Sequence, residues 1–323
     1  MTKLTRRTVI AGLGALMALP ARAEEVWPSR PITLVHGFPP GGPVDVLSRI
    51  LADGLTKKLG QPVVVEAKPG AAGTTAAGLV ARAAPDGYTL TALGATFTAA
   101  SAMYRTLPYN PSEDFTFIST TAEYPLVLVT YPDSDLRTVA DIVKLARSRS
   151  EPLLYGTAGN GTLMHLTMAL FAKKANIRLQ HVPYKGGLPA VTDLLGKRLD
   201  LVLEPPTVPL PFVKDNKLRA IAVTSAEHFF ALPDCPTMIE SGYAGFVVIA
   251  SQGVAGPSGL PAAVTAKVNR ALAAVLADRS VVEKLKAVGN IPRPSSPQEY
   301  RARVVADVAR WNGVIDGAHI ARI

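Results

Sequence analysis

Residues 32–45 read ITLVHGFPPGGPVD and combine a short apolar run, a turn rich in proline and glycine, and the start of a helical pattern. Ile32, Leu34 and Val35 suit a buried strand, and apolar residues then recur every three or four positions along residues 46–59. The turn therefore leads a buried strand directly into the first turn of a helix, which is a unit typical of an α/β sheet.

The turn has the properties of an anion site. The first backbone N–H groups of a helix have no partner within the helix and together carry about half a positive charge. Gly41 and Gly42 have no side chain to keep a ligand away, so a carboxylate would fit here without a lysine or arginine. The same residues also suit a tight connection that binds nothing. The remainder of the chain has to distinguish these two interpretations.

The beginning of the chain has the pattern of an export signal. Residues 1–23 contain Lys3, Arg6 and Arg7, then an uncharged apolar stretch, and end in Ala-Arg-Ala. This order predicts a signal peptide cleaved after Ala23 and a periplasmic protein. The adjacent arginines suit the twin-arginine route, although general secretory signals carry such pairs as well. The apolar run is shorter than the roughly 20 residues that span a bilayer, so we expect the mature chain to be soluble.

Composition excludes several classes of function. The chain has 34 basic and 25 acidic residues, and residues 1–23 hold four of the basic ones and no acid, which leaves a net charge of +5 on the rest. This charge is dispersed, so we expect no nucleic-acid partner, while a small positive excess suits an anionic ligand. Cys235 is the only cysteine and the five histidines are scattered, so no disulfide, metal site or cofactor is expected. Cys235 is expected to pack as a small hydrophobic residue and not to act as a reactive thiol.

Strand and helix patterns alternate along the chain, and about 300 mature residues favour two lobes over one core. The first half continues with a strand at 62–66, a glycine-rich turn, a helix ending at 84 and a strand at 88–93, which indicates a parallel sheet. Thr138, followed three residues later by Asp141, predicts a helix start. A strand is expected to cross back to the first lobe at 246–254, before helices at 261–276, 281–288 and 297–316.

The second half repeats the opening design. A short strand at 153–155 is followed by GTAGNGT at 156–162 and by a helix from 163 to about 176. Binding loops of parallel sheets lie at the carboxyl ends of the strands. We therefore expect the two glycine turns to face each other across one cleft.

The joint order of several short motifs resembles the Bug-type, TctC-like extracytoplasmic solute receptors of tripartite tricarboxylate transporters. The matching motifs extend over essentially the whole mature chain, and they are FPPGG at 38–42, GQPVVVE at 60–66, PGAAG at 69–73, APDGYTL at 84–90, LPY at 107–109, GTAGNGT at 156–162 and HVPYKG at 181–186.

The resemblance implies an α/β type II periplasmic-binding fold with two lobes joined by two crossing strands and a ligand enclosed between them. The lobes would comprise residues 24–124 with 249–323, and residues 125–248. Backbone amides of the two glycine turns would hold a carboxylate. The implied ligand-binding residues of the first lobe are Phe38, Pro40, Gly41, Gly42, Asp45, Thr96 and Thr98. Those of the second lobe are Thr157, Gly159, Asn160, Gly161, Thr162, His165, Tyr184, Lys185, Gly186 and Glu204.

Some of these side chains have a structural alternative. Asp45 suits the first turn of a helix, where the helix dipole stabilises a carboxylate, as well as a ligand contact. His165 suits a hydrogen-bonded structural role, and Lys185 suits either a loop brace or an anion contact. Glu204 ends an apolar strand and needs a partner if it is buried, so it either lines the cleft or pairs within the protein.

Three departures from the family pattern bear on the ligand. Pro43 stands where the family more often has glycine or serine, which removes one N–H donor. His36 and Gly37 replace the usual Val-Pro. Glu204 and Pro205 replace a common Asp-Asn pair whose acid can receive the amino group of amino-acid ligands, and the longer Glu204 either keeps that role or closes the pocket against it.

The function predicted from these features is capture of a small organic carboxylate and its delivery to membrane permease subunits by a monomeric protein. A receptor that reports the ligand to a sensor kinase is the first alternative. An exported hydrolase is the second, but the chain has no Gly-x-Ser-x-Gly motif and no evident nucleophile with a base and an orienting acid. The sequence does not specify the ligand, and Phe38, Phe97 and Tyr184 are the candidates for stacking on it.

Overall fold

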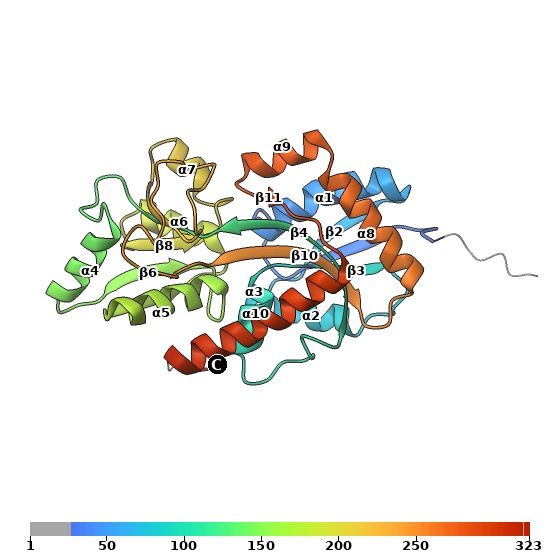
Figure 1. The fold of residues 1–323 in the computed structure, drawn as a ribbon, viewed down its shortest axis with the longest axis horizontal. Coiled ribbons are helices and arrows are strands. Elements are labelled where there is room, and N and C mark those ends of the chain that lie inside the picture. The colour runs from blue at the N-terminus through green and yellow to red at the C-terminus, as the bar shows by residue number, and fades with distance from the viewer. Residues whose placement is uncertain (1–26, 319) are drawn as a thin grey trace, which may run out of the picture.

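The computed structural model describes residues 27–318 and 320–323, and the signal peptide predicted at residues 1–23 lies outside them. The described residues form two β-sheets that lie next to each other along the long axis of the molecule, each flanked by helices (Figure 1). This arrangement confirms the predicted two-lobed α/β class. Within the described part of the chain, no helix is both long and apolar enough to cross a membrane.

The first sheet has six strands in the order β11-β4-β10-β3-β1-β2. β1 pairs in parallel with β2 and β3, and β10 is antiparallel to β3 and β4. The strands are β1 (Ile32–His36), β2 (Val63–Ala67), β3 (Thr89–Leu93), β4 (Phe115–Pro125), β10 (Ile249–Pro257) and β11 (Ile291–Pro292). The parallel pairing of the first three strands confirms the parallel sheet predicted from strand–helix alternation.

The second sheet has five strands in the order β7-β6-β8-β5-β9. β6 is parallel to β7 and β8, whereas β5 is antiparallel to β8 and β9. The strands are β5 (Val127–Thr130), β6 (Leu153–Thr157), β7 (Leu179–Pro183), β8 (Leu201–Glu204) and β9 (Arg219–Val223).

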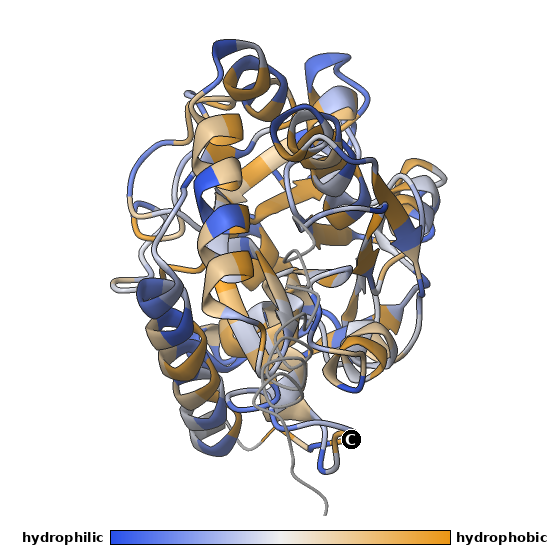
Figure 2. Ribbon diagram, turned by 90° about the vertical axis from the view of Figure 1, so that its right-hand side faces the viewer, coloured by the Kyte–Doolittle hydropathy of each residue, from blue (hydrophilic) through white to orange (hydrophobic). Residues whose placement is uncertain are grey.

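Helix α1 (Pro43–Leu59) shows why the strand–turn–helix unit forms. Pro43 occupies the first helical position, where a missing N–H costs nothing, and Gly60 ends the helix in a left-handed conformation with φ of 75°. Leu47, Leu51 and Leu55 form a buried stripe that packs on the first sheet. Figure 2 shows hydrophobic residues concentrated on the interior strands and hydrophilic ones on outward-facing parts of the helices.

Most of the other helices match predicted ones, but those at residues 96–103 and 210–214 were not predicted. The other helices are α2 (Thr74–Ala81), preceded by a 3₁₀ turn at Ala71–Gly73, α3 (Thr96–Met103), α4 (Val139–Ser148), α5 (Leu163–Ala175), α6 (Gly187–Leu195), α7 (Leu210–Lys214), α8 (Ala262–Leu276), α9 (Arg279–Ala287) and α10 (Pro297–Ala318). Thr138 and Asp141 form the predicted capping box at the start of α4, with the Asp141 amide donating to Thr138 Oγ1 over 3.1 Å.

Two segments connect the sheets, and Thr224 joins them. The chain passes from β4 into β5 at Leu126 and returns to β10 through Val248. The Leu126 amide donates to Thr224 Oγ1 over 2.8 Å, and this hydroxyl in turn donates to the Val248 carbonyl over 2.6 Å. Because Thr224 is buried, one hydroxyl couples both crossings where they pass between the lobes. The returning strand begins three residues later than the predicted 246–254.

Helix α10 packs against both lobes, which the sequence did not indicate. It packs on α3 and β4 of the first lobe and also contacts α5 of the second (Figure 1). Trp311 and Ile315 of α10 belong to one buried cluster together with Met103 of α3 and Phe171 of α5. The backbone of Ile323 then pairs with Met103 and Arg105, which fixes the described end of the chain against α3.

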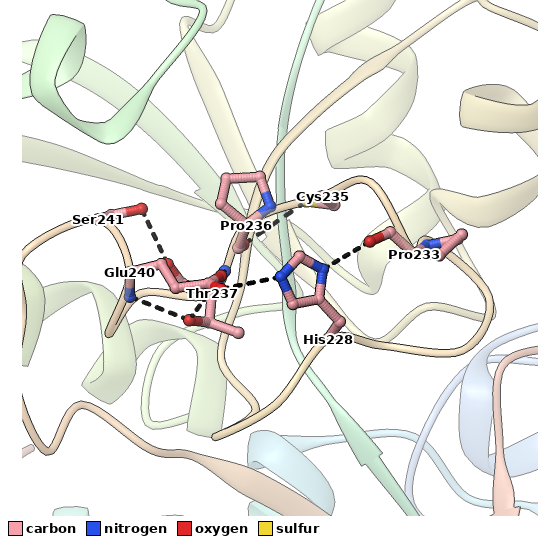
Figure 3. A network of polar contacts seen from close by, with 7 residues as sticks. All are labelled: His228, Pro233, Cys235, Pro236, Thr237, Glu240 and Ser241. Carbon is pink, nitrogen blue, oxygen red and sulfur yellow. Dashed lines mark hydrogen bonds and ion pairs between the residues drawn. The ribbon is translucent and has the colours of Figure 1, made fainter.

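A polar network stabilises the loop that carries Cys235 (Figure 3). His228 Nε2 pairs with Glu240 Oε1 over 2.9 Å, and Glu240 Oε2 accepts the Thr237 amide over 2.8 Å. Burial raises the pKa of the Cys235 thiol to about 12, and the side chain packs in the apolar cluster around Val223 and Phe229. The thiol is therefore protonated at neutral pH, which confirms the prediction of a packed, unreactive cysteine.

Candidate functional site

A cavity of about 240 Å³ lies between the lobes and is called the central cavity below. Its walls come from the turns that follow β1, β3, β6 and β7, from the end of β8, and from the two crossing segments. The lining residues are Phe38, Pro39, Pro40, Gly41, Gly42, Pro43, Val44, Gly94, Ala95, Thr96, Tyr124, Leu126, Ala158, Leu163, Met164, Lys185, Gly186, Gly187, Leu188, Pro189, Glu204, Pro205 and Ala250. The cavity thus lies at the carboxyl ends of strands from both sheets, where α/β proteins bind ligands.

Four helices begin at the central cavity. Lining residues include Val44 of α1, Thr96 of α3, Leu163 of α5 and Leu188 of α6, each in the first or second position of its helix. The unpaired N–H groups at such ends give each helix a partial positive charge. The cavity therefore has an electrostatic preference for anions that does not depend on a cationic side chain.

In the turn after β1, hydrogen bonds within the protein hold the glycines. The Gly41 amide donates to Asp45 Oδ2 over 2.9 Å, and the Gly42 amide donates to the Pro39 carbonyl over 3.3 Å. Among the hydrogen bonds of the described residues, none is donated by the Val44 or Asp45 amide. The amides of this turn that have no partner within the protein are thus those of Val44 and Asp45, in the first turn of α1. The sequence had suggested the amides of Gly41 and Gly42 instead.

The Asp45 carboxylate stabilises the turn through hydrogen bonds. It is buried and accepts hydrogen bonds from His36 Nε2 and Arg49 Nε, both over 3.0 Å, in addition to the Gly41 amide. Burial alone would raise the pKa of Asp45, but the hydrogen bonds from Arg49, Gly41 and His36 outweigh it and lower the pKa. Burial lowers the pKa of His36, and its Nδ1 accepts the Phe38 amide over 3.4 Å. Asp45 does not line the central cavity, so its geometry matches the structural alternative.

The turn after β6 is built in a similar way. The Gly159 amide donates to Thr157 Oγ1 over 3.2 Å, the Gly161 amide donates to His165 Nδ1 over 3.3 Å, and Thr162 caps α5. The ring of His165 stacks on His181 with a centroid distance of 4.1 Å. Burial lowers the pKa of both rings, that of His181 to about 3, so both are neutral at ordinary pH.

A second pocket of about 630 Å³, called the side pocket, adjoins the central cavity. The two share Phe38, Pro39, Ala158, Lys185 and Gly186. Tyr184, in the loop between β7 and α6, lines the side pocket, but its hydroxyl donates to Asp193 Oδ2 of α6 over 2.7 Å.

The predicted site residues therefore fall into three groups. Those that line the central cavity are Phe38, Pro40, Gly41, Gly42, Thr96, Lys185, Gly186 and Glu204. Those that line only the side pocket are Gly159, Asn160 and Tyr184. Those that line neither pocket are Asp45, Thr98, Thr157, Gly161, Thr162 and His165.

The stacking candidate Phe97 lies elsewhere. It packs in an aromatic cluster of the first lobe, 5.6 Å from the ring of Tyr109 and 5.3 Å from that of Phe115.

The lobes touch across the central cavity. The Leu163 amide, at the start of α5, donates to Thr96 Oγ1 of α3 over 3.5 Å. Gly186 lies so close to Pro39 that a Cβ at Gly186 would be 3.4 Å from Pro39 Cγ. These contacts join elements of opposite lobes, so the described conformation has its binding loops in contact.

Glu204 is the acidic side chain of the central cavity. It is only 1% exposed, and neither carboxyl oxygen has a hydrogen-bond partner among the described residues. Burial raises its pKa to about 8, and the nearby amide of Ala158 offsets this in part without forming a hydrogen bond.

Sequence reasoning missed the apolar part of the lining. Tyr124, Leu126 and Ala250 lie on the crossing segments, and Leu163 and Met164 begin α5. Such residues look like ordinary core in a sequence. No pattern in the sequence marked them as lining residues.

Two lobes with a cavity between facing binding loops define a solute-binding protein of the two-lobed periplasmic class. Residues 47–320 match the family described as "Tripartite tricarboxylate transporter family receptor". The chain is 35% identical to a UPF0065 protein of Pseudomonas sp. strain P51, over 98% of this chain and 95% of that one. It is 33% identical to BugT of Bordetella pertussis, over 97% of each chain. The chain therefore belongs to the tripartite tricarboxylate transporter receptor family.

Solved structures agree with this assignment. Rpa4515 of R. palustris, solved with adipate, is 34% identical with a TM-score of 0.88, over 92% of this chain and all of that one. The periplasmic binding protein BugD is 34% identical with a TM-score of 0.86, over 91% and 99% of the chains. MatC of Rhodopseudomonas palustris, solved with malate, is 30% identical with a TM-score of 0.84, over 90% and 100%. Membership of this family confirms the prediction of a binding protein that is not an enzyme.

Proposed function

We propose that this protein is an extracytoplasmic receptor that captures a small organic carboxylate in the central cavity and delivers it to the permease subunits of a tripartite tricarboxylate-type transporter. The observation that carries this proposal is the convergence of four helix N-termini on one cavity between the lobes. The carboxylates in the structures of the adipate-bound and malate-bound relatives support the ligand class.

In this proposal, the ligand carboxylate accepts a hydrogen bond from the free amide of Val44, which lines the cavity in the first turn of α1, with Lys185 providing a cation at the edge of the cavity. The predicted residues that line the cavity contact the ligand or the waters around it. Asp45, Thr157, Thr162 and His165 hold the turns in position and contribute to affinity indirectly.

Capture requires the lobes to separate and close. We place the lobe boundaries at residues 124/125 and 248/249, with residues 24–124 and 249–323 in one lobe and 125–248 in the other. Rotation at the two crossings would break the contacts of Thr96 with Leu163 and of Pro39 with Gly186. A ligand that bridges the two walls then favours the closed state by the difference in its affinity for the two conformations.

The proposal includes export of the protein to the periplasm. Cleavage after Ala23 would release a monomeric receptor into the periplasm, where the family's receptors meet their transporters. The sequence pattern of residues 1–23 supports this step.

Thermal unfolding against a panel of acids tests the ligand class. The mature protein is unfolded, dialysed to remove any co-purified ligand and refolded, and is then heated with adipate, malate, hexanoate or the uncharged diamide adipamide. A carboxylate at 100 times its dissociation constant should stabilise the protein by about 2.7 kcal/mol, while adipamide should give no shift. A shift with adipamide equal to that with adipate, or no shift with any acid, would contradict carboxylate binding.

A further inference from the structure

Glu204 is the buried polar side chain of the central cavity that the protein leaves without a partner. It is the last residue of β8, at the cavity wall formed by the second lobe, whereas the free amides of α1 belong to the first lobe. Its carboxyl group lies directly against the start of α6, since a Cβ at Gly187 would be 2.5 Å from Glu204 Oε2. A carboxyl group buried without a hydrogen bond is costly, so its presence in a ligand cavity points to a partner supplied by the ligand.

Few charges face this carboxyl group. The other ionisable side chains among the described lining residues are Tyr124 of β4 and Lys185 of the loop after β7. Burial raises the pKa of Tyr124 well above its usual value, so its hydroxyl stays neutral, and no ion pair links Lys185 to Glu204. The N-terminus of α6 and the Ala158 amide favour an ionised carboxylate, but neither forms a hydrogen bond with it.

Burial is therefore the main influence on the protonation state of Glu204. With its pKa raised to about 8, Glu204 is mostly a carboxylic acid at neutral pH. A carboxylic acid has one O–H donor, whereas a carboxylate can only accept hydrogen bonds. In the described structure this donor has no acceptor.

We propose that the neutral Glu204 carboxyl donates its O–H to a second acceptor at the far end of the ligand, so that the receptor prefers acids carrying a second carboxylate or carbonyl group. This inference rests on the proposed function, in which α1 holds the first carboxylate. It has two consequences. The protein must keep one proton at Glu204 to bind a dicarboxylate, and an ammonium group at the far end of a ligand meets a donor where it needs an acceptor.

Calorimetric titration with adipate and hexanoate between pH 6.5 and 9.5 tests the inference, because the two acids share a six-carbon chain and differ in the second carboxylate. The dissociation constant of adipate should rise about tenfold per pH unit above pH 8, with proton uptake visible as a dependence on buffer ionisation enthalpy. Hexanoate should bind more weakly and show no such dependence.

Three variants test whether Glu204 acts as a hydrogen-bond donor and whether it causes the pH dependence. Glu204→Gln retains an N–H donor without a titratable group, so adipate should bind it with an affinity that is constant over this pH range. Glu204→Leu removes the donor and should bind adipate at least tenfold more weakly at pH 7, with hexanoate unchanged. Lys185→Gln should keep the pH dependence of the wild type, since it removes the basic side chain among the described lining residues and leaves Glu204 in place.

The outcomes that overturn the inference are distinct from those that overturn the proposed function. Equal adipate affinity at pH 7 and pH 9, unaffected by Glu204→Leu, would reject the donor role while leaving carboxylate binding intact. Tightest binding of aspartate at pH 9, abolished by Glu204→Gln, would show that Glu204 acts as a charged acceptor. Failure of both acids to bind at every pH would reject the proposed function itself.

Discussion

Replacing Gly41 with valine is expected to weaken carboxylate binding at least tenfold, whereas the same change at Gly60 leaves affinity unchanged. The two glycines are a matched pair at opposite ends of α1. Gly41 has φ of 78° and Gly60 has φ of 75°, and a Cβ at either position would meet no atom within 4 Å. A β-branched residue is strained at this φ whatever the available space, at a cost of about 1–2 kcal/mol.

Only the backbone strain at Gly41 is expected to affect the central cavity. Gly41 lines it and sets the path of the chain into the free amides of α1, so relief of the strain moves those donors. Chemical denaturation should report similar losses of unfolding free energy for Gly41→Val and Gly60→Val, and calorimetry should report different affinities for adipate. Unchanged affinity in Gly41→Val, with the same loss of stability in both variants, would remove this turn from the site.

The second large effect concerns the stability of the unliganded protein. Glu204→Gln should be more stable than the wild type at pH 8, with a much smaller advantage at pH 5. The unfolded chain loses the Glu204 proton near the usual pKa of 4.5, whereas the folded protein holds it up to about pH 8. Between these values each unit of rising pH therefore favours unfolding of the wild type by roughly tenfold in the equilibrium constant, and glutamine escapes this penalty.

Urea denaturation at pH 5 and pH 8 measures this difference. Glu227→Gln is the matched control because Glu227 is exposed, and its stability difference from the wild type should change little with pH. Parallel pH profiles for Glu204→Gln and the wild type would show that the buried carboxyl group ionises normally, and would weaken the case for a neutral donor in the cavity.

Most of the fold could be predicted because its signals are local. The leucine stripe of α1, the capping box at Thr138 and the strand–glycine–helix units each depend on neighbouring residues, and the structure places them where the patterns indicate. Strand β4 and the contacts of α10 with both lobes were not foreseen, because their positions depend on packing between distant segments.

The candidate site was less predictable from the sequence. The glycine turns could be found from composition, but no sequence rule shows that the amides of Gly41 and Gly42 bond to Asp45 and Pro39 and leave the first amides of α1 free. The missing partner of Glu204 is also a tertiary property, since the apolar residues around it come from both lobes.

A crystal structure of the mature protein with adipate would test the central claim most directly. We expect one adipate in the central cavity, with one carboxylate within hydrogen-bond distance of the Val44 amide and the other facing Glu204. Adipate bound outside the space between the lobes, or a central cavity that stays without it at saturating concentration, would contradict the claim that this cavity is a carboxylate site.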